Sequence, residues 1–285
     1  MAEKYLGEVL REAKQSLFRA DIATWALDAE IILSYIMDLR KEQLITHDKM
    51  ILTPKQLEAF ELALNNRIEA MPVQYIIKRC EFMGMDFYVD ENVLIPRPDT
   101  EILVEAAMEY VREISAKSVL DICTGSGAIA ISLAKYCPSL KKITASDISA
   151  KALAVAHVNA TDNGVREKIN FEESDFLENI EGSFDIIVSN PPYIREADIK
   201  RLEVNVKAYE PLIALSGGED GLFFYRKMAE ESAFYLNDNG RIFLEIGYDQ
   251  AEDVTEIFGR KGFKRISLLK DLAGLDRTLI FSKNI

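Results

Sequence analysis

Cysteine and histidine are scarce in this chain, and long apolar runs are missing. The 285 residues include three cysteines and two histidines, and no two cysteines have CxxC spacing. This pattern argues against a disulfide framework and against a zinc site, and it fits a reducing cytoplasm. No apolar run reaches the roughly 18 residues of a membrane helix, and the N-terminus has no signal-peptide core. We therefore expect a cytoplasmic protein with no metal and no membrane partner.

Basic side chains are also fewer than acidic ones. The chain has 34 Lys and Arg against 47 Asp and Glu, which gives a net charge of -13. Residues 1–80 are nearly balanced, with 11 basic and 12 acidic side chains, so almost all of the excess lies in the rest of the chain. A strongly acidic body is a poor electrostatic partner for a phosphate backbone. We expect no direct binding of nucleic acid.

The length allows two domains, and the first of them, residues 1–72, has the apolar spacing of helices. One helix is expected over 22–37 with Asp21 as its cap, and another begins with Thr53 as N-cap and Pro54 in its first turn. Two interpretations of this helical domain stay open. It is either a bundle that only packs on its neighbour or a recognition domain for a macromolecule.

A change of composition follows over residues 73–92. The segment is rich in β-favouring side chains around Gly84, which predicts a β-hairpin that links two domains. Arg97 lies just beyond it and is either a salt-bridged or solvated side chain or a rim residue that contacts substrate. A helix begins next, and Asp99 or Thr100 can cap it.

Residues 93–285 are expected to form an open α/β sheet. From Ser118 onwards strands and helices alternate, which is typical of βαβ units and a parallel sheet. Seven strands are expected. The last two, near 263–269 and 277–282, have no helix between them and should pair as antiparallel neighbours. The sequence therefore predicts a seven-stranded, Rossmann-like sheet with a terminal antiparallel hairpin.

A glycine-bearing turn follows the first strand of this sheet, with the sequence Cys123-Thr124-Gly125-Ser126-Gly127. Ligands bind at this point in open α/β sheets, and glycines let the backbone approach them closely. Asp147 ends the second strand, where a carboxylate can accept hydrogen bonds from ribose hydroxyls. The turn and the acid leave NAD(P) and S-adenosylmethionine as candidate ligands.

The tetrapeptide Asn190-Pro191-Pro192-Tyr193 follows a short apolar strand, 184–189. Two prolines end the strand and place the Asn190 carboxamide and the Pro191 carbonyl at a rigid position. Two acceptors and the flat face of Tyr193 suit a planar group that bears an NH2. The alternative is an ordinary turn between a strand and a loop.

Two further residues bear on the choice of ligand. Asp121, just before the glycine turn, would repel a pyrophosphate but can serve the cationic headgroup of a methionine. Phe176, after the third strand, either stacks on an adenine or packs in the core. The turn also lacks the full GxGxxG pattern. Together with the tetrapeptide, these features favour S-adenosylmethionine.

Several longer motifs carry a resemblance over almost the whole chain. They are Pro96-Arg97-Pro98-Asp99-Thr100-Glu101, Leu120 to Ala130, Ile187 to Ile194, Tyr209-Glu210-Pro211, Gly218 to Leu222 and Leu244-Glu245-Ile246-Gly247. On these motifs the sequence resembles the HemK/PrmC family, which are glutamine-N5 methyltransferases of peptide chain release factors. Cys123 is a departure, since some members have glycine there.

The resemblance implies methyl transfer from S-adenosylmethionine to the glutamine of a Gly-Gly-Gln loop in release factors, with the helical domain gripping that partner. The expected catalytic residues are Asn190, Pro191 and Tyr193. The expected cofactor site comprises Asp121, Cys123, Thr124, Gly125, Ser126, Gly127, Asp147, Phe176 and Asn190. The expected substrate site comprises Arg97, Asn190, Pro191, Pro192 and Tyr193. The alternatives are an amino-methyltransferase of nucleic-acid bases or of ribosomal protein L3 glutamine, and a non-catalytic protein that binds S-adenosylmethionine.

Overall fold

The computed structural model describes residues 3–283, and the chain divides into two compact units. The helical unit comprises Met1–Arg79 together with Glu203–Tyr209, and the sheet unit comprises Cys80–Leu202 and Glu210–Ile285. The chain therefore first passes from the helical unit into the sheet unit between Arg79 and Cys80.

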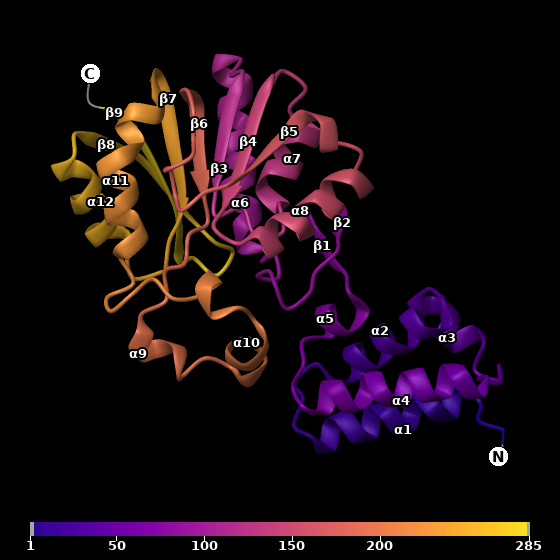
Figure 1. Cartoon of the computed structure of the whole chain (residues 1–285). Helices are drawn as coiled ribbons and strands as arrows, with labels where there is room; N and C mark the ends of the chain where they lie inside the picture. The colour runs from indigo at the N-terminus through magenta and orange to yellow at the C-terminus, as the bar shows by residue number, and fades with distance from the viewer. Residues whose placement is uncertain (1–2, 284–285) are drawn as a thin grey trace. The chain divides into compact units, whose positions relative to one another are not determined.

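The helical unit is built on three longer helices and several short ones (Figure 1). Its helices are α1 (Leu6–Arg19), α2 (Trp25–Met37), α3 (Lys41–Thr46), α4 (Pro54–Ile68), α5 (Val73–Ile77) and α10 (Val204–Tyr209). The apolar faces of α1, α2 and α4 meet in one core, where Leu17, Leu33 and Phe60 are almost fully buried. Amphipathic helices of this length gain most of their stability from such shared burial.

Thr53 caps α4 as the sequence predicted. The Gln56 amide donates to its hydroxyl at 3.3 Å, and the Gln56 side chain accepts from the Thr53 amide at 3.0 Å, which completes a capping box. The expectation for α2 was wrong. This helix begins at Trp25, and Asp21 has the left-handed φ of 57° in the turn after α1, so it cannot cap α2.

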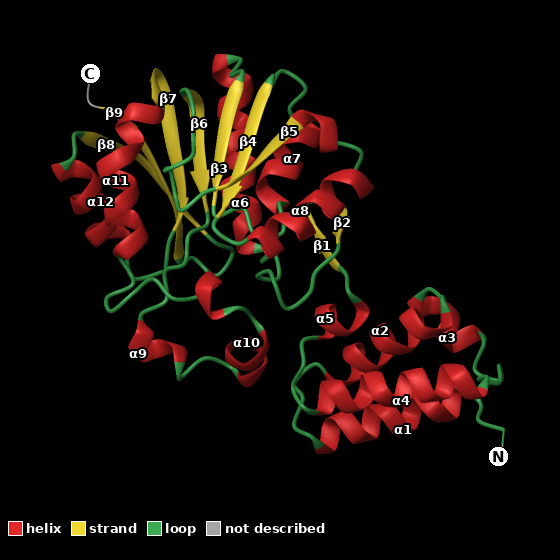
Figure 2. Cartoon of the chain, viewed as in Figure 1, coloured by secondary structure: helices red, strands yellow, loops and turns green. Residues whose placement is uncertain are grey.

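The linking hairpin is shorter than predicted. Residues 73–77 form the helix α5, whereas the sequence analysis placed them in the hairpin. Their β-branched side chains are overridden by packing, since Val73 and Ile76 both lie against the core of the helical unit. The strands are only β1 (Cys80–Phe82) and β2 (Met85–Phe87), joined at Gly84, which has a φ of 68° (Figure 2).

The sheet of the second unit has seven strands, in the order β5-β4-β3-β6-β7-β9-β8. The strands are β3 (Ser118–Ile122), β4 (Lys142–Asp147), β5 (Ile169–Glu173), β6 (Phe184–Ser189), β7 (Leu236–Glu245), β8 (Phe263–Lys270) and β9 (Asp276–Lys283). The first five are parallel, and β9 pairs antiparallel with both β7 and β8. The predicted sheet and its terminal antiparallel hairpin are confirmed.

Helices cover both faces of this sheet. One face carries α6 (Asp99–Ile114), α7 (Ala128–Tyr136) and α8 (Ala150–Asp162), and the other carries α11 (Phe223–Tyr235) and α12 (Ala251–Arg260). Each face has its own apolar core. Along β3, the Val119 side chain packs in the core on the face of α6, α7 and α8, and the Leu120 side chain packs in the core on the face of α11 and α12. The central strands are buried on both sides, which explains their nearly continuous apolar sequences.

The remaining elements are short: η1 (Arg166–Lys168), α9 (Glu196–Ile199) and η2 (Leu212–Ala214). Of the helices found in residues 3–283, none is both long enough and apolar enough to cross a membrane.

Candidate functional site

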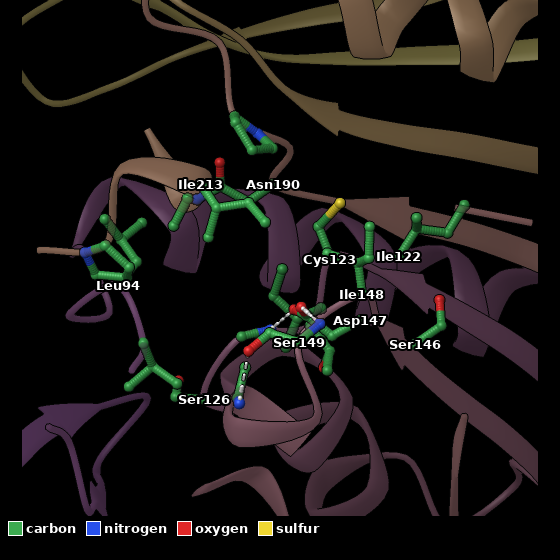
Figure 3. A pocket seen from close by; sticks show the side chains of 18 of the residues that line it. Leu94, Ile122, Cys123, Ser126, Ser146, Asp147, Ile148, Ser149, Asn190 and Ile213 are labelled. Carbon is green, nitrogen blue, oxygen red and sulfur yellow. Dashed lines mark hydrogen bonds between the residues drawn. The ribbon is translucent and has the colours of Figure 1, made fainter. Parts of the chain in front are cut away.

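A pocket of about 320 Å³ lies at the carboxyl ends of the central strands, within the sheet unit (Figure 3). Its size is typical of small-molecule sites. Nine of the predicted site residues line it: Arg97, Cys123, Thr124, Gly125, Ser126, Asp147, Phe176, Asn190 and Pro192. The other four, Asp121, Gly127, Pro191 and Tyr193, are not among its lining residues.

Asp147, at the end of β4, is tied to the glycine turn. Its Oδ2 accepts from the Gly125 amide and its Oδ1 accepts from the Ser149 amide, both at 2.9 Å. Burial raises the pKa of this carboxyl above its ordinary value. Figure 3 shows Asp147 with these hydrogen bonds on the pocket wall. A carboxylate has four acceptor positions, so Asp147 keeps capacity for hydroxyl groups of a ligand.

Gly127 serves packing. It has a φ of 82°, and an added Cβ would lie 2.8 Å from the Ile131 side chain and 3.1 Å from that of Ala156. A larger residue there would have to adopt a strained positive φ and would crowd Ala156 of α8. Gly127 is the N-cap of α7 and lies outside the pocket lining, and its predicted place in the cofactor site stays a prediction.

Asp121 is fully buried beneath the turn. Its Oδ2 accepts from the Thr124 hydroxyl at 2.6 Å and from the Ala130 amide at 3.2 Å. Its Oδ1 is buried and has no hydrogen-bond partner among the described residues. Burial raises its pKa to about 7. An unpaired buried carboxylate oxygen suits a cationic donor such as an ammonium group.

Phe176 belongs to the core and to the pocket at once. It is 4% exposed, lies in the core cluster on the α11 side, and lines the pocket. Its φ of 64° is rare for a bulky residue, and such strain persists only where the surroundings fix it. The ammonium of Lys227 lies 5.3 Å from its ring centroid and also pairs with Asp175 at 2.9 Å.

Arg97 is salt-bridged, as one of the two sequence interpretations had it, and it also lies on the pocket, whereas its contact with substrate stays a prediction. It lines the pocket, and its guanidinium donates to the carboxylate of Glu210, whose side chain is almost fully buried. The residues after Glu210 continue into the pocket wall at Pro211, Ile213 and Ala214. Arg97 therefore fixes the segment that closes this side of the pocket.

Asn190 is held by a contact that the sequence did not predict. Its Nδ2 donates to the Thr100 hydroxyl oxygen at 3.2 Å. Thr100 is not a helix cap, because α6 begins after Pro98 and the Thr100 hydroxyl donates instead to Glu245 Oε2 at 2.5 Å. Glu245 ends β7, is 1% exposed, and also accepts from the Tyr193 hydroxyl at 3.2 Å. Burial raises the pKa of Glu245 to about 7.

The loop after Tyr193 is clamped by a second segment. Gln250 Nε2 donates to the carbonyl of Tyr193 at 3.0 Å and to that of Gly221 at 3.2 Å. A Cβ on Gly221 would lie 2.5 Å from the Tyr193 carbonyl oxygen, and one on Gly217 would lie 2.8 Å from the Tyr193 Cα. Gln250 was missed from the sequence. Gly221 had a signal there, because it belongs to the motif Gly218 to Leu222.

Residues 3–283 contain no group of three or more His, Cys, Asp or Glu side chains that could hold a metal ion. The pocket is instead lined by a glycine turn, an acid at the end of β4 and an amide at the end of β6.

Comparison with known proteins decides the family. Residues 8–77 match the family profile described as PrmC N-terminal domain, and residues 98–213 match that of the Methyltransferase small domain. A release factor glutamine methyltransferase of Clostridium acetobutylicum is 45% identical over 256 residues, 89% of this chain and 90% of the relative. The chain belongs to the release factor glutamine methyltransferase family. It is an S-adenosylmethionine-dependent methyltransferase, as the resemblance implied.

Other relatives agree over a greater length. A release factor glutamine methyltransferase of Clostridium botulinum is 38% identical over 277 residues, 96% of this chain and 98% of the relative. Among solved structures, a methyltransferase of Pyrococcus furiosus has a TM-score of 0.52 at 20% identity, covering 78% of this chain and 98% of that one. This structural likeness bears on the fold alone, and it confirms a Rossmann-like methyltransferase sheet.

The first prediction concerns Asp147. We expect its free acceptor positions to hold the ribose hydroxyls of S-adenosylmethionine, and a charge-assisted hydrogen bond is worth about 1.5–3 kcal/mol. Asp147→Ala should therefore raise the cofactor Kd at least about tenfold, measured by calorimetry. Glu173→Ala is the matched control, because Glu173 pairs with Asp147 in register on β5 but is exposed and outside the pocket lining. Equal cofactor Kd values for the two variants would remove Asp147 from the cofactor site.

Proposed function

We propose that this enzyme transfers a methyl group from S-adenosylmethionine to the side-chain amide nitrogen of the glutamine in the Gly-Gly-Gln loop of peptide chain release factors. The observation that carries the proposal is the presence of Asn190 and Asp147 on one pocket, in a chain of this family. Asn190 can accept a hydrogen bond from an amide substrate, and Asp147 can accept hydrogen bonds from ribose hydroxyls.

The cofactor supplies an electrophilic methyl group on a sulfonium. The substrate amide nitrogen is a poor nucleophile, because its lone pair is delocalised into the carbonyl. Asn190 Oδ1 and the Pro191 carbonyl accept the two amide hydrogens, which turns the nitrogen toward the methyl group. They also stabilise the positive charge that develops on it. The bond from nitrogen to methyl would form as the bond from sulfur to methyl breaks, so that S-adenosylhomocysteine leaves and the nitrogen gives up one proton to water. Tyr193 packs against the plane of the amide in this proposal.

The test is mass spectrometry of a release factor after incubation with the enzyme and S-adenosylmethionine. One methyl group is expected on the glutamine of the Gly-Gly-Gln loop. A release factor with that glutamine replaced by glutamate is the control and should stay unmodified. Methyl transfer to RNA or DNA, with none to the release factor, would contradict the proposal.

We also propose a role for the helical domain predicted over residues 1–72, as a recognition domain that grips the release factor in the cytoplasm. The excess of acidic side chains lies outside this domain, in residues 81–285, and there it disfavours a nucleic-acid substrate, because an acidic body repels a phosphate backbone. The sequence alternative, a bundle that only packs on its neighbour, is tested in the Discussion.

A further inference from the structure

Four side chains form a single line of hydrogen bonds behind Asn190. The Asn190 carboxamide contacts the Thr100 hydroxyl, that hydroxyl contacts Glu245, and Glu245 contacts the Tyr193 hydroxyl. Asn190 directly follows β6, and Tyr193 lies in the loop beyond it. Glu245 ends β7, and Thr100 lies in the first turn of α6. Of the four, Thr100 and Asn190 line the pocket.

The direction of each hydrogen bond in this line is set by Glu245. An ionised carboxylate can only accept, so the hydroxyls of both Thr100 and Tyr193 must donate to it. The Thr100 hydroxyl has one hydrogen, and that hydrogen is used on Glu245 Oε2 at 2.5 Å. Toward Asn190, Thr100 then has only lone pairs to offer. It therefore selects the NH2 end of the carboxamide.

We propose that Thr100 and Glu245 are positioning residues that fix which end of the Asn190 carboxamide faces the reaction. With the NH2 end held on Thr100, the Oδ1 end is left for the substrate amide. This inference rests on the proposed function, because it takes Asn190 as the acceptor of the substrate hydrogens. A carboxamide turned the other way would direct the Asn190 NH2 group at the NH2 group of the substrate. Two donors cannot form a hydrogen bond, so the substrate would not be held.

Protonation of Glu245 would remove this control. A neutral carboxyl group carries its own hydrogen and can donate it to Thr100. The Thr100 hydroxyl would then be free to donate to Asn190 Oδ1, which reverses the carboxamide. Burial brings the pKa of Glu245 to about 7, so the orientation of Asn190 becomes dependent on pH near neutrality.

Several other groups face Glu245 from the elements around it. The Tyr225 hydroxyl, from α11, donates to the backbone carbonyl of Glu245 at 2.9 Å. Arg277 on β9 lowers the pKa of Glu245, whereas Asp99 on α6 raises it. Arg277 is itself paired with Asp271 at 2.9 Å and with Asp99 at 3.2 Å. Burial is the largest of these influences, so the pKa of Glu245 is raised on balance.

The main test is a double-mutant cycle on methylation of a Gly-Gly-Gln release factor. Thr100→Val keeps the shape of the side chain but loses the hydroxyl, and kcat should fall about tenfold because the acceptor is misplaced. In the Asn190→Ala background the same change should lower kcat by less than about twofold, because Thr100 acts through Asn190. Thr100→Ser keeps the hydroxyl and should stay within about threefold of wild type.

The pH profile is the second test, measured as kcat at saturating cofactor so that cofactor binding does not enter. Wild-type kcat should fall as the pH drops below about 7, because Glu245 takes up a proton. Glu245→Gln should lose most of this acid limb and lower kcat about tenfold at pH 8, since an amide can donate to Thr100. Glu105→Gln, an exposed change on α6, is the matched control and should behave as wild type.

The outcomes separate this inference from the proposed function. If wild type methylates the release factor but the losses from Thr100→Val and Asn190→Ala multiply, the positioning role is overturned and the function stands. The role is equally overturned if Glu245→Gln keeps both the wild-type kcat and the acid limb. If wild type transfers no methyl group to the release factor, the proposed function itself fails.

Discussion

Asn190→Ala is expected to lower kcat for release-factor methylation by about 10²–10³, the range found when one preorganised hydrogen-bond partner is deleted. The loss arises because Asn190 Oδ1 is the proposed acceptor for the substrate amide, and its bond strengthens as the nitrogen becomes cationic. The cofactor Kd should change less, because much of the pocket is lined by the glycine turn and by residues at the end of β4. Single-turnover kinetics and calorimetry would measure the two effects separately.

Asn190→Asp sharpens this test, because a carboxylate also accepts hydrogen bonds. It should keep more activity than Asn190→Ala if acceptance is the main role of this side chain. A kcat for Asn190→Ala within about threefold of wild type, far below the expected loss, would show that Asn190 does not act on the substrate.

Removal of residues 1–79 is expected to lower kcat/KM for an intact release factor at least about a hundredfold, or about 2.7 kcal/mol. The reason is that binding energy from remote parts of a substrate is used to position the reacting group. The cut falls at the boundary between Arg79 and Cys80, where the chain passes into the sheet unit. The cofactor Kd of the truncated enzyme should stay near that of the full chain, because every residue that lines the pocket belongs to the sheet unit.

A short Gly-Gly-Gln peptide is the matched control substrate for this truncation. It is too small to use a remote recognition domain, so both forms of the enzyme should methylate it with similar kcat/KM. Equal activity of the two forms on the intact release factor would refute the recognition role. It would support the simpler alternative, in which the helical domain only packs on its neighbour.

The sheet could be predicted from sequence because each of its strands carries a local signal. Ser118 to Ile122 is mostly apolar and is followed by a glycine turn, and Phe184 to Ser189 is mostly apolar and is followed by Asn190 and two prolines. The same local rules failed for α5. The side chains of Val73 to Ile77 favour a strand, and only their packing on the helical core makes them a helix.

The pocket residues could be predicted where a motif also marks a strand end, as at Asp147 and Asn190. The support behind Asn190 could not be predicted in this way. Thr100 and Glu245 are 145 residues apart, and no spacing rule brings the start of α6 to the end of β7. Asp99 and Thr100 were the two candidate caps because both residue types favour that position, but the helix begins at Asp99 and contains both of them. A buried carboxylate nearby offered the Thr100 hydroxyl a stronger acceptor.

The clamp of Gly221 and Gln250 on Tyr193 has a consequence for protein engineering. Because a side chain at Gly221 has no space beside the Tyr193 carbonyl, the two loops cannot be diversified independently. A library that varies only Asn190 to Tyr193 leaves the packing of Gly217, Gly221 and Gln250 against this loop unchanged. A redesign toward bulkier amine substrates would have to vary 217–221 and Gln250 in the same library.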